Sequence, residues 1–285
     1  MVQYDFATLA RQLIAKANRT PANGVAFLER AAPDVVQQIR RDARQRGPLS
    51  FWGRSENIDE LADTIIVEPS VLHVIAAIAG RNVSTRTPHA GLQHTYGYLF
   101  STIETEYGFK RDRWVKSSIG LAVGFDSTVL GPHPDQGTLL ANATWLSGQI
   151  AFRGHRERLR RLRSFLSKKF HGELSKFDVT RFKHVRLLET ARTSWRKKTR
   201  SWTLQTDIIE STMRPGRMLL VYSIVDNDKQ THELITLFPT TSDTRDALVD
   251  RAGTRKRSDI RIRYNAYVPA LKGRVLSGSC RVKRF

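Results

Sequence analysis

The sequence predicts an α+β fold in which N-terminal helices are followed by a largely antiparallel β-sheet, with one basic amphipathic helix inserted. Apolar residues recur at helical spacing before residue 80, short β-type segments dominate after residue 181, and an arginine-rich segment with a leucine stripe lies between them. We therefore expect a helical segment at 1–80 and a β-rich region at 81–285 that contains the basic helix. With 285 residues and 40% apolar side chains, the two parts can form one compact unit.

The first 80 residues carry nine basic and nine acidic side chains, so this part is electrically neutral. Phe6, Leu9 and Leu13 follow helical spacing, as do Val35 and Ile39. Prolines and a Gly-Pro pair punctuate the segment, which predicts three or four short helices.

Residues 82–152 are rich in Thr, Tyr, Ser, Gly and Ile, and the runs TYGYLFSTIE and LLANATWLSGQIAF favour strands. A hairpin is expected around Tyr107, Gly108 and Phe109, although no Asn-Gly or Asp-Gly pair fixes its turn type. The GPHPDQG segment at 131–137 is typical of a rigid surface turn.

The segment 153–170 predicts a basic amphipathic helix, because Leu159, Leu162 and Leu166 fall on one face and arginines occupy the rest. Five β-type segments follow, and the clearest hairpin joins RMLLVYSIV to HELITLFPT across 226–229. A short helix is expected at 242–251, capped by Ser242 or Thr244.

The net charge of +20 is concentrated in two stretches. Residues 153–200 hold 17 basic side chains against four acids, and 251–285 hold eleven against one, whereas 201–250 carry eight acids and four bases. Arginine outnumbers lysine 34 to 13, and its planar fork suits phosphate. Aromatic residues are interleaved with these cations, so we expect a basic face that binds nucleic acid, DNA more than RNA. The expected contact residues are Arg153, Arg156, Arg160, Arg163, Lys168, Lys169, Arg196, Lys197, Lys198, Arg200, Arg255, Lys256 and Arg257.

Residues 87–114 are the densest stretch in reactive side chains, and the candidate catalytic residues lie there. His94 would exchange a proton near pH 7, Tyr96 would hold or relay it, and Lys110 or Arg111 would stabilise an oxyanion, with Glu104 beside them. The same residue types also fill half-buried strand positions, so a purely structural interpretation is about as well supported. His89 is a weaker candidate, because it shares a strand face with His94 only if the chain bends between them.

Several classes of chemistry lack their motifs. No phosphate-binding Gly-Lys-Ser/Thr loop, dinucleotide-binding glycine triplet, Gly-x-Ser-x-Gly elbow or histidine pair at metal-ligand spacing occurs, so we expect no cofactor and no metal. A Mg²⁺ site formed by Glu104, Glu106 and either Asp126 or Asp135 is the remaining metal alternative, although arginines would compete for those carboxylates. The single cysteine, Cys280, excludes an internal disulfide.

The leading hypothesis is a cytoplasmic protein that acts on nucleic acid, because no secretory signal or membrane-length apolar run is present. Its sharpest form is a hydrolase or lyase that cleaves or modifies DNA. The alternatives are an enzyme for an anionic small molecule, steered by the positive field, and a non-catalytic nucleic-acid-binding protein. The oligomeric state stays open, with a homodimer among the options.

Overall fold

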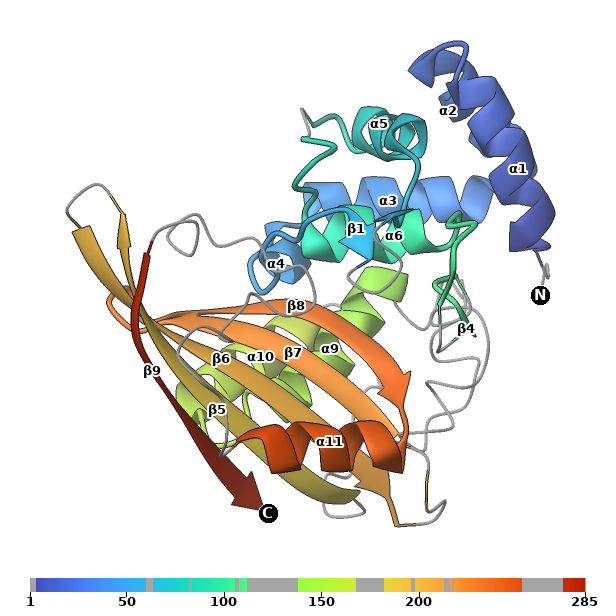
Figure 1. Ribbon diagram of the computed structural model, residues 1–285. Helices are drawn as coiled ribbons and strands as arrows, with labels where there is room; N and C mark the ends of the chain where they lie inside the picture. Colours follow the sequence, from blue (N-terminus) through green and yellow to red (C-terminus); the bar gives the residue numbers. More distant parts are fainter. Residues whose placement is uncertain are drawn as a thin grey trace.

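The computed structural model describes residues 4–59, 64–81, 84–105, 108–111, 138–167, 182–195, 198–212, 216, 218–252 and 274–284. It confirms the predicted α+β class, since helices come first and an antiparallel sheet follows (Figure 1). Within the described ranges, no helix is long and apolar enough to cross a membrane.

The N-terminal segment is helical as predicted, with five helices among its described residues where three or four were expected. They are α1 (Phe6–Ala17), α2 (Pro21–Ala31), α3 (Pro33–Arg44), α4 (Arg46–Leu49) and α5 (Pro69–Ile78). The side chain of Asp5 accepts hydrogen bonds from the first backbone N–H groups of α1, and Thr20 does the same for α2. Proline stands at the start of α2, α3 and α5, where its missing N–H costs nothing.

The strand predicted for TYGYLFSTIE is wrong at its beginning, because residues 90–98 are helical. A π-helix, η1 (Ala90–His94), continues directly into α6 (Thr95–Tyr98). His89 caps this unit, since its Nδ1 accepts hydrogen bonds from the backbone N–H groups of Gly91 and Leu92. All nine helical residues are buried, so no polar stripe marks the helical period in the sequence.

The strand predicted for LLANATWLSGQIAF is also wrong, because this segment forms the helix α9 (Leu139–Ala151). Every residue of α9 is buried, including four polar ones. A helix that is buried on all sides has no polar face, and its continuous apolar run cannot be distinguished from a buried strand by periodicity. Thr138 caps it by accepting a hydrogen bond from the backbone N–H of Ala141.

Two short antiparallel pairs lie among the helices. β1 (Ile58–Asp59) pairs with β2 (Thr64–Ile65), and β3 (Glu104–Thr105) pairs with β4 (Gly108–Phe109). A hairpin is thus present here, but Gly108 and Phe109, expected in its connection, form its second strand, with two residues in each strand. The segment 113–125, expected as the second strand, lies outside the described residues. The GPHPDQG segment lies outside the described residues.

The main sheet contains β5 (Phe182–Trp195), β6 (Lys198–Ser211), β7 (Met218–Asp226), β8 (Thr231–Thr240) and β9 (Arg274–Arg284). All neighbours are antiparallel, in the order β8-β7-β6-β5-β9. The predicted β7–β8 hairpin is confirmed, with Asp226 accepting from the backbone N–H groups of Asp228 and Lys229 in the turn.

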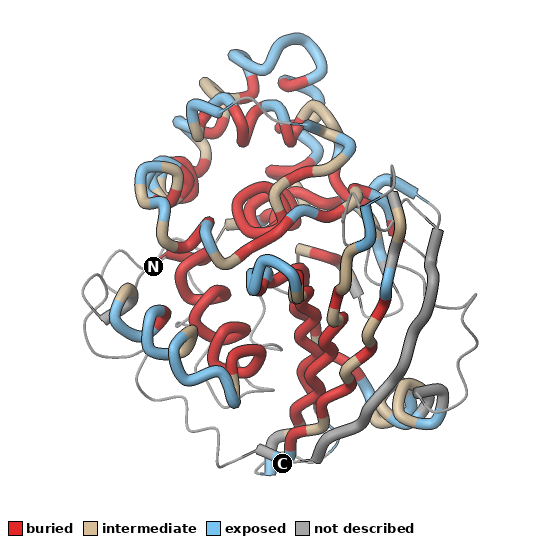
Figure 2. The backbone as a smooth tube through the Cα atoms, turned by 90° about the vertical axis from the view of Figure 1, so that its left-hand side faces the viewer, coloured by how far each residue is buried: buried red, intermediate tan, exposed pale blue. Residues whose placement is uncertain are grey.

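Different helices cover the two faces of this sheet. α9 lies across one face, where Ile209, Leu219 and Val221 join the main core, and α10 (Arg156–Ser167) packs on the outer side of α9 (Figure 1). α11 (Ser242–Ala252) lies on the opposite face, where its Leu248 contacts a second apolar cluster that includes Ile208. Figure 2 shows α9 buried along its whole length and the outward side of α10 exposed.

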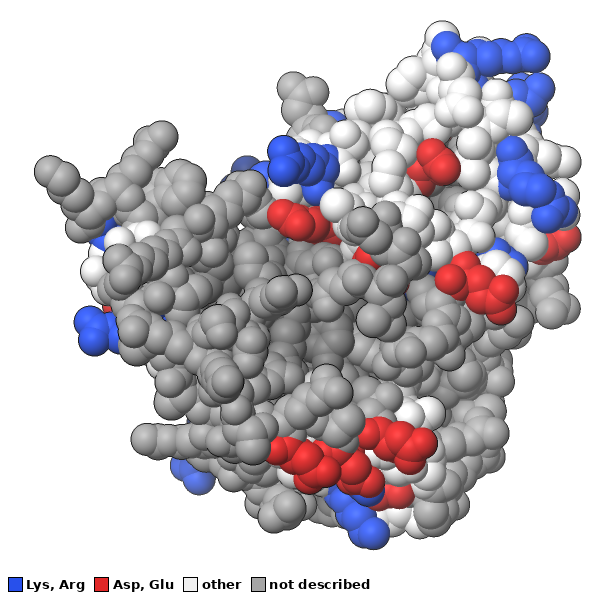
Figure 3. All heavy atoms as spheres, viewed as in Figure 1, with Lys and Arg blue, Asp and Glu red and all other residues white. Residues whose placement is uncertain are grey.

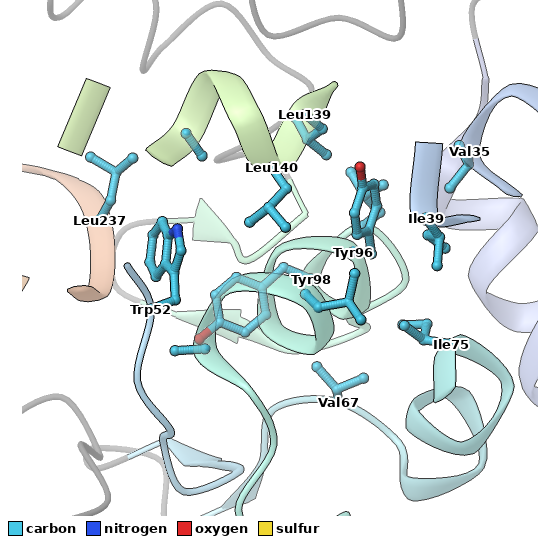
Figure 4. Close-up of a cluster of buried hydrophobic side chains, with 14 of the residues drawn as sticks. Val35, Ile39, Trp52, Val67, Ile75, Tyr96, Tyr98, Leu139, Leu140 and Leu237 are labelled. Atoms are coloured by element: carbon cyan, nitrogen blue, oxygen red, sulfur yellow. The ribbon is translucent and has the colours of Figure 1, made fainter. Parts of the chain in front are cut away.

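One core cluster joins the N-terminal helices to the sheet, since it includes residues of α1, α3, α5, α9, β7 and β8. Trp52 lies near its centre, between Leu237 of the sheet and Leu140 of α9 (Figure 4). Its indole Nε1 donates a 2.6 Å hydrogen bond to the Thr144 hydroxyl, which fixes the ring against α9.

Candidate functional site

The outward face of α10 is the most basic surface element among the described residues with a regular backbone. The helix carries five arginines and one acid, Glu157. Leu162 is fully buried and Phe165 is half-buried against the core, which turns the arginines outward. The side chains of Arg160 and Arg161 are 71% and 69% exposed. As the sequence predicts, α10 therefore packs on the core by its apolar side and exposes arginines on its outer side.

Glu157 organises part of this face. Its two carboxylate oxygens accept hydrogen bonds from Arg160 and Arg161 at 2.9–3.0 Å. These hydrogen bonds lower the pKa of Glu157 to about 2. One acid cannot neutralise five guanidinium groups, so the face keeps a net positive charge at every physiological pH.

The other predicted contact residues divide into three groups. Arg153 turns toward the sheet, with its Nη1 3.4 Å from Nδ1 of His184. Lys198 and Arg200 lie at the β5–β6 end of the sheet, where Arg200 approaches Asp226 at 3.8 Å. The remaining ones lie outside the described residues: Lys168, Lys169, Arg196, Lys197, Arg255, Lys256 and Arg257.

His94 lies in a buried aromatic and charged cluster. Its ring stacks on Tyr98 with 5.1 Å between centroids, and the Tyr98 hydroxyl lies 3.2 Å from its Nδ1. The ammonium of Lys110 lies 6.0 Å from the Tyr98 ring and forms a 3.0 Å ion pair with Asp59. The structure thus places two of the predicted catalytic residues, His94 and Lys110, near the same ring, that of Tyr98.

This environment keeps the His94 ring neutral. Burial, reinforced by the positive charges of Lys110 and His89, lowers the pKa of His94 to about 3. Its Nε2 is buried and has no hydrogen-bond partner in the described part of the chain. With 2% of its surface exposed, His94 is an uncharged core residue at neutral pH, not an open acid-base group.

Tyr96 belongs to a different cluster. Its hydroxyl donates a hydrogen bond to Asp42 of α3, whose other oxygen accepts from the Thr138 hydroxyl at 2.7 Å. The hydroxyls of Tyr96 and Tyr98 point away from each other (Figure 4). Burial raises the pKa of Asp42 to about 7, although both hydroxyl donors oppose the rise. Because Thr138 is the N-cap of α9, this cluster attaches α3 and α6 to the start of that helix.

The last two predicted catalytic residues lie at the edge of this region. Glu104 is exposed in β3, opposite Phe109 of β4. Arg111 covers the Phe109 ring at 3.8 Å and donates a 3.2 Å hydrogen bond to the backbone carbonyl of Ser101. The five predicted residues therefore occupy three separate environments, and no hydrogen bond or ion pair between any two of them appears among the described contacts.

A second buried ionic cluster was not predicted. Arg186 of β5 donates to Asp207 of β6 at 2.6 Å, and Nε2–H of His184 donates to the same oxygen at 2.6 Å. The amide of Gln205 donates to the other oxygen at 2.7 Å. Burial alone would raise the pKa of Asp207, but the contacts with His184 and Arg186 outweigh it and lower the pKa. The register places Arg186 directly opposite Asp207, but only the pairing of two distant strands reveals it.

The same cluster closes the C-terminus of α9. Arg186 donates to the backbone carbonyls of Ile150, Ala151 and Arg153, and Gln205 also donates to that of Ala151. A cation at this end complements the helix dipole and satisfies carbonyls that have no partner within the helix. We interpret Arg186 and Asp207 as structural residues that hold α9 on the sheet.

In the described ranges, no three His, Cys, Asp or Glu side chains gather as ligands for a metal ion. The chain matches no protein-family model, no curated protein and no solved structure.

Proposed function

We propose that this protein binds nucleic acid, with the arginine face of α10 as its principal contact surface. The observation that carries the proposal is the geometry of α10: leucine and phenylalanine anchor one side, and five arginines with a single acid occupy the rest. Guanidinium groups displayed on one helix face can form charge-assisted, often bidentate, hydrogen bonds with phosphates, and such contacts position a protein on a nucleic-acid backbone.

The uneven distribution of charge along the chain also supports nucleic acid as the partner. Residues 201–250 carry twice as many acids as bases, so the excess of +20 comes from elsewhere, mainly from 153–200 and 251–285. A polyanion approaching this protein would be steered toward one part of its surface. Because the contacts we propose are to phosphates, the binding would show little sequence preference.

The catalytic form of the proposal, cleavage or modification of DNA, would depend on His94 and Lys110. Their burial beneath Tyr98 makes it the weaker form, because a substrate has to reach a ring that is 2% exposed. Incubation of the protein with end-labelled DNA and RNA distinguishes the two forms. Product that disappears in His94→Ala, with binding retained, would favour the enzyme; a loss of roughly 10²–10⁴ in rate is typical of a general acid or base.

The binding proposal is tested by fluorescence anisotropy with a labelled duplex, titrated at several salt concentrations. Log K should fall linearly with log salt, with a slope of about 0.9 for each phosphate contacted. The triple variant Arg156→Gln, Arg160→Gln and Arg161→Gln should weaken binding to all sequences alike and reduce the slope by up to about 0.9 per lost contact.

A matched control removes three positive charges elsewhere. Arg11, Lys16 and Arg19 are exposed at α1 and just beyond it, and changing them to Gln alters the net charge by the same amount. Equal weakening by both triple variants would show a general charge effect and contradict the assignment to α10. No salt dependence in the unaltered protein would contradict nucleic-acid binding itself.

A further inference from the structure

A pocket opens between α11 and the sheet, on the face opposite α9. Its volume is about 390 Å³, within the range of sites that hold small molecules. The pocket has an apolar floor and a charged rim, and every lining residue belongs to β5, β6, β7 or α11.

The floor is formed by side chains that alternate toward this face. Val185 and Ile208 are direct partners in the β5–β6 register, Ile208 is also the partner of Leu220 in β7, and Met218 and Val249 complete the surface. Ile208 and Met218 are 2% and 1% exposed, whereas Val185 and Val249 are half-buried. A branched or linear hydrocarbon group of a ligand would therefore cover partly wetted apolar surface.

The rim carries two cations, Lys183 and Arg245, and two acids, Glu210 and Asp246. Arg245 contacts both acids: its guanidinium donates to Asp246 at 2.7 and 3.1 Å and lies 3.5 Å from Glu210. Lys183 is the cross-strand partner of Glu210, yet it makes no ion pair with any described residue. Its ammonium is therefore available to a ligand anion.

The surroundings of the pocket add negative charge on the α11 side. Asp243, Asp246 and Asp250 are exposed on α11, and acidic side chains gather over this helix on the face seen in Figure 3. A ligand ammonium would be favoured there and a ligand carboxylate near Lys183. Lys183 of β5 and Asp246 of α11 thus belong to different walls of one apolar pocket.

We propose that this pocket binds a small zwitterion with an apolar side chain, such as an apolar amino acid. The ammonium of the ligand faces Asp246 on the α11 wall, its carboxylate faces Lys183 on the sheet, and its side chain covers Val185, Ile208, Met218 and Val249. The site is independent of α10 and of nucleic acid, because it lies on the other face of the sheet.

The test compares three probes of one carbon skeleton by ligand-observed NMR titration at millimolar concentration. They are leucine, 3-methylbutylamine, which lacks the carboxylate, and 4-methylpentanoate, which lacks the ammonium. Leucine should bind more tightly than either analogue, with each exposed charge contact contributing up to about fivefold in Kd. Equal affinity of all three probes, or no binding of leucine, would overturn the proposal.

Two variants identify the site. Lys183→Gln should bring leucine down to the affinity of 3-methylbutylamine without weakening the amine itself, because it removes only the carboxylate partner. Lys229→Gln, at the exposed β7–β8 turn, is the matched control and should leave all three affinities unchanged. Val249→Trp should fill the pocket and abolish binding, with a thermal melt to verify folding. Leucine binding that is unaffected by Lys183→Gln would refute the assignment even if Val249→Trp fails to fold.

Discussion

Arg186 and Asp207 form an ion pair beneath the C-terminus of α9, with 2.6 Å between Nε and Oδ1 and side chains that are 5% and 0% exposed. The pair joins β5 to β6, and through the carbonyls of Ile150 and Ala151 it joins the sheet to the central helix. At the other end of α9, Gln38 and Asp42 of α3 bond to the backbone N–H of Leu139 and the Thr138 hydroxyl. The helix therefore has side-chain hydrogen-bond acceptors at its N-terminus and a cation at its C-terminus.

Removal of one partner of the Arg186–Asp207 pair should be strongly destabilising. Arg186→Leu leaves the buried Asp207 carboxylate without its main cation, and we expect a loss of about 3–5 kcal/mol in the free energy of unfolding. The double variant Arg186→Leu, Asp207→Leu should lose much less than the sum of the two single variants, because no uncompensated charge stays buried. Urea unfolding of all four proteins measures the coupling, and additive losses would show that the pair does not act as a unit.

The raised pKa of Asp42 gives a stability term that decreases with rising pH. The folded state holds the proton up to a pH of about 7, whereas the unfolded chain releases it near 4, so between these values the folded state binds more protons. Asp42 therefore contributes a slope of roughly −1.4 kcal/mol per pH unit to the free energy of unfolding across that window. Asp42→Asn should remove this contribution and so make the slope measured by urea unfolding between about pH 4.5 and 6.5 more positive by about 1.4 kcal/mol per pH unit. An unchanged slope would mean that Asp42 ionises normally.

His94 should have the opposite effect. Its pKa of about 3 lies below that of an unfolded histidine, so the unfolded state binds the extra proton and stability is lost as the pH falls from about 6.5 toward 3. Between about pH 4 and 6.5 the two contributions oppose each other, so His94→Gln should shift the slope of stability against pH in the negative direction and Asp42→Asn should shift it in the positive direction. Shifts of opposite sign in the same unfolding experiment would confirm both assignments, and an unchanged or more positive slope in His94→Gln would contradict the neutral core histidine.

The sequence predicts four of the sheet's strands, β5 to β8, from their apolar and β-branched runs and the turn between β7 and β8. It does not predict β9, and the fifth predicted segment, 259–268, lies outside the described residues. The mostly apolar segments of β7 and β8 are separated by the polar turn at 227–230, and in α10 leucine and arginine recur at helical spacing. The same rule fails for α9, because burial on every side removes the polar stripe that would identify a helix.

The candidate site is harder to predict than the sheet. A segment dense in His, Tyr, Lys and Glu can form either a reaction centre or a hydrogen-bonded polar core, and the composition is the same in both cases. Tyr96 and His94 are two residues apart, yet one bonds to Asp42, 54 residues away, and the other stacks on Tyr98. No pattern in the local sequence indicates the contact between Tyr96 and Asp42. The period of two in β5 does place His184 and Arg186 on one face, and a buried pair of this kind requires an acid on the adjacent strand. The sequence of β5 therefore indicates that such a partner exists, but it does not give the strand register that selects Asp207.

Gly91 provides a test of the packing that holds η1 against the core. A Cβ at this position would lie 2.8 Å from Cγ and 2.9 Å from Cδ1 of Trp52, closer than such atoms approach in folded proteins. The indole cannot move away easily, because it is 5% exposed and its Nε1 is bonded to Thr144. Gly91→Ala should therefore destabilise the protein by about 1–3 kcal/mol, despite the better helix propensity of alanine.

A smaller side chain at position 52 shows whether the cost of Gly91→Ala comes from the clash with Trp52 or from the backbone of the π-helix. Trp52→Leu alone should be destabilising, since it removes the hydrogen bond to Thr144 and leaves unfilled volume. Adding Gly91→Ala to that background should then cost little or restore some stability, because the new methyl group occupies the vacated space. Thermal or urea unfolding of the four proteins gives the coupling energy. If Gly91→Ala costs the same with either residue at 52, the strain lies in the π-helical backbone and not in the contact with Trp52.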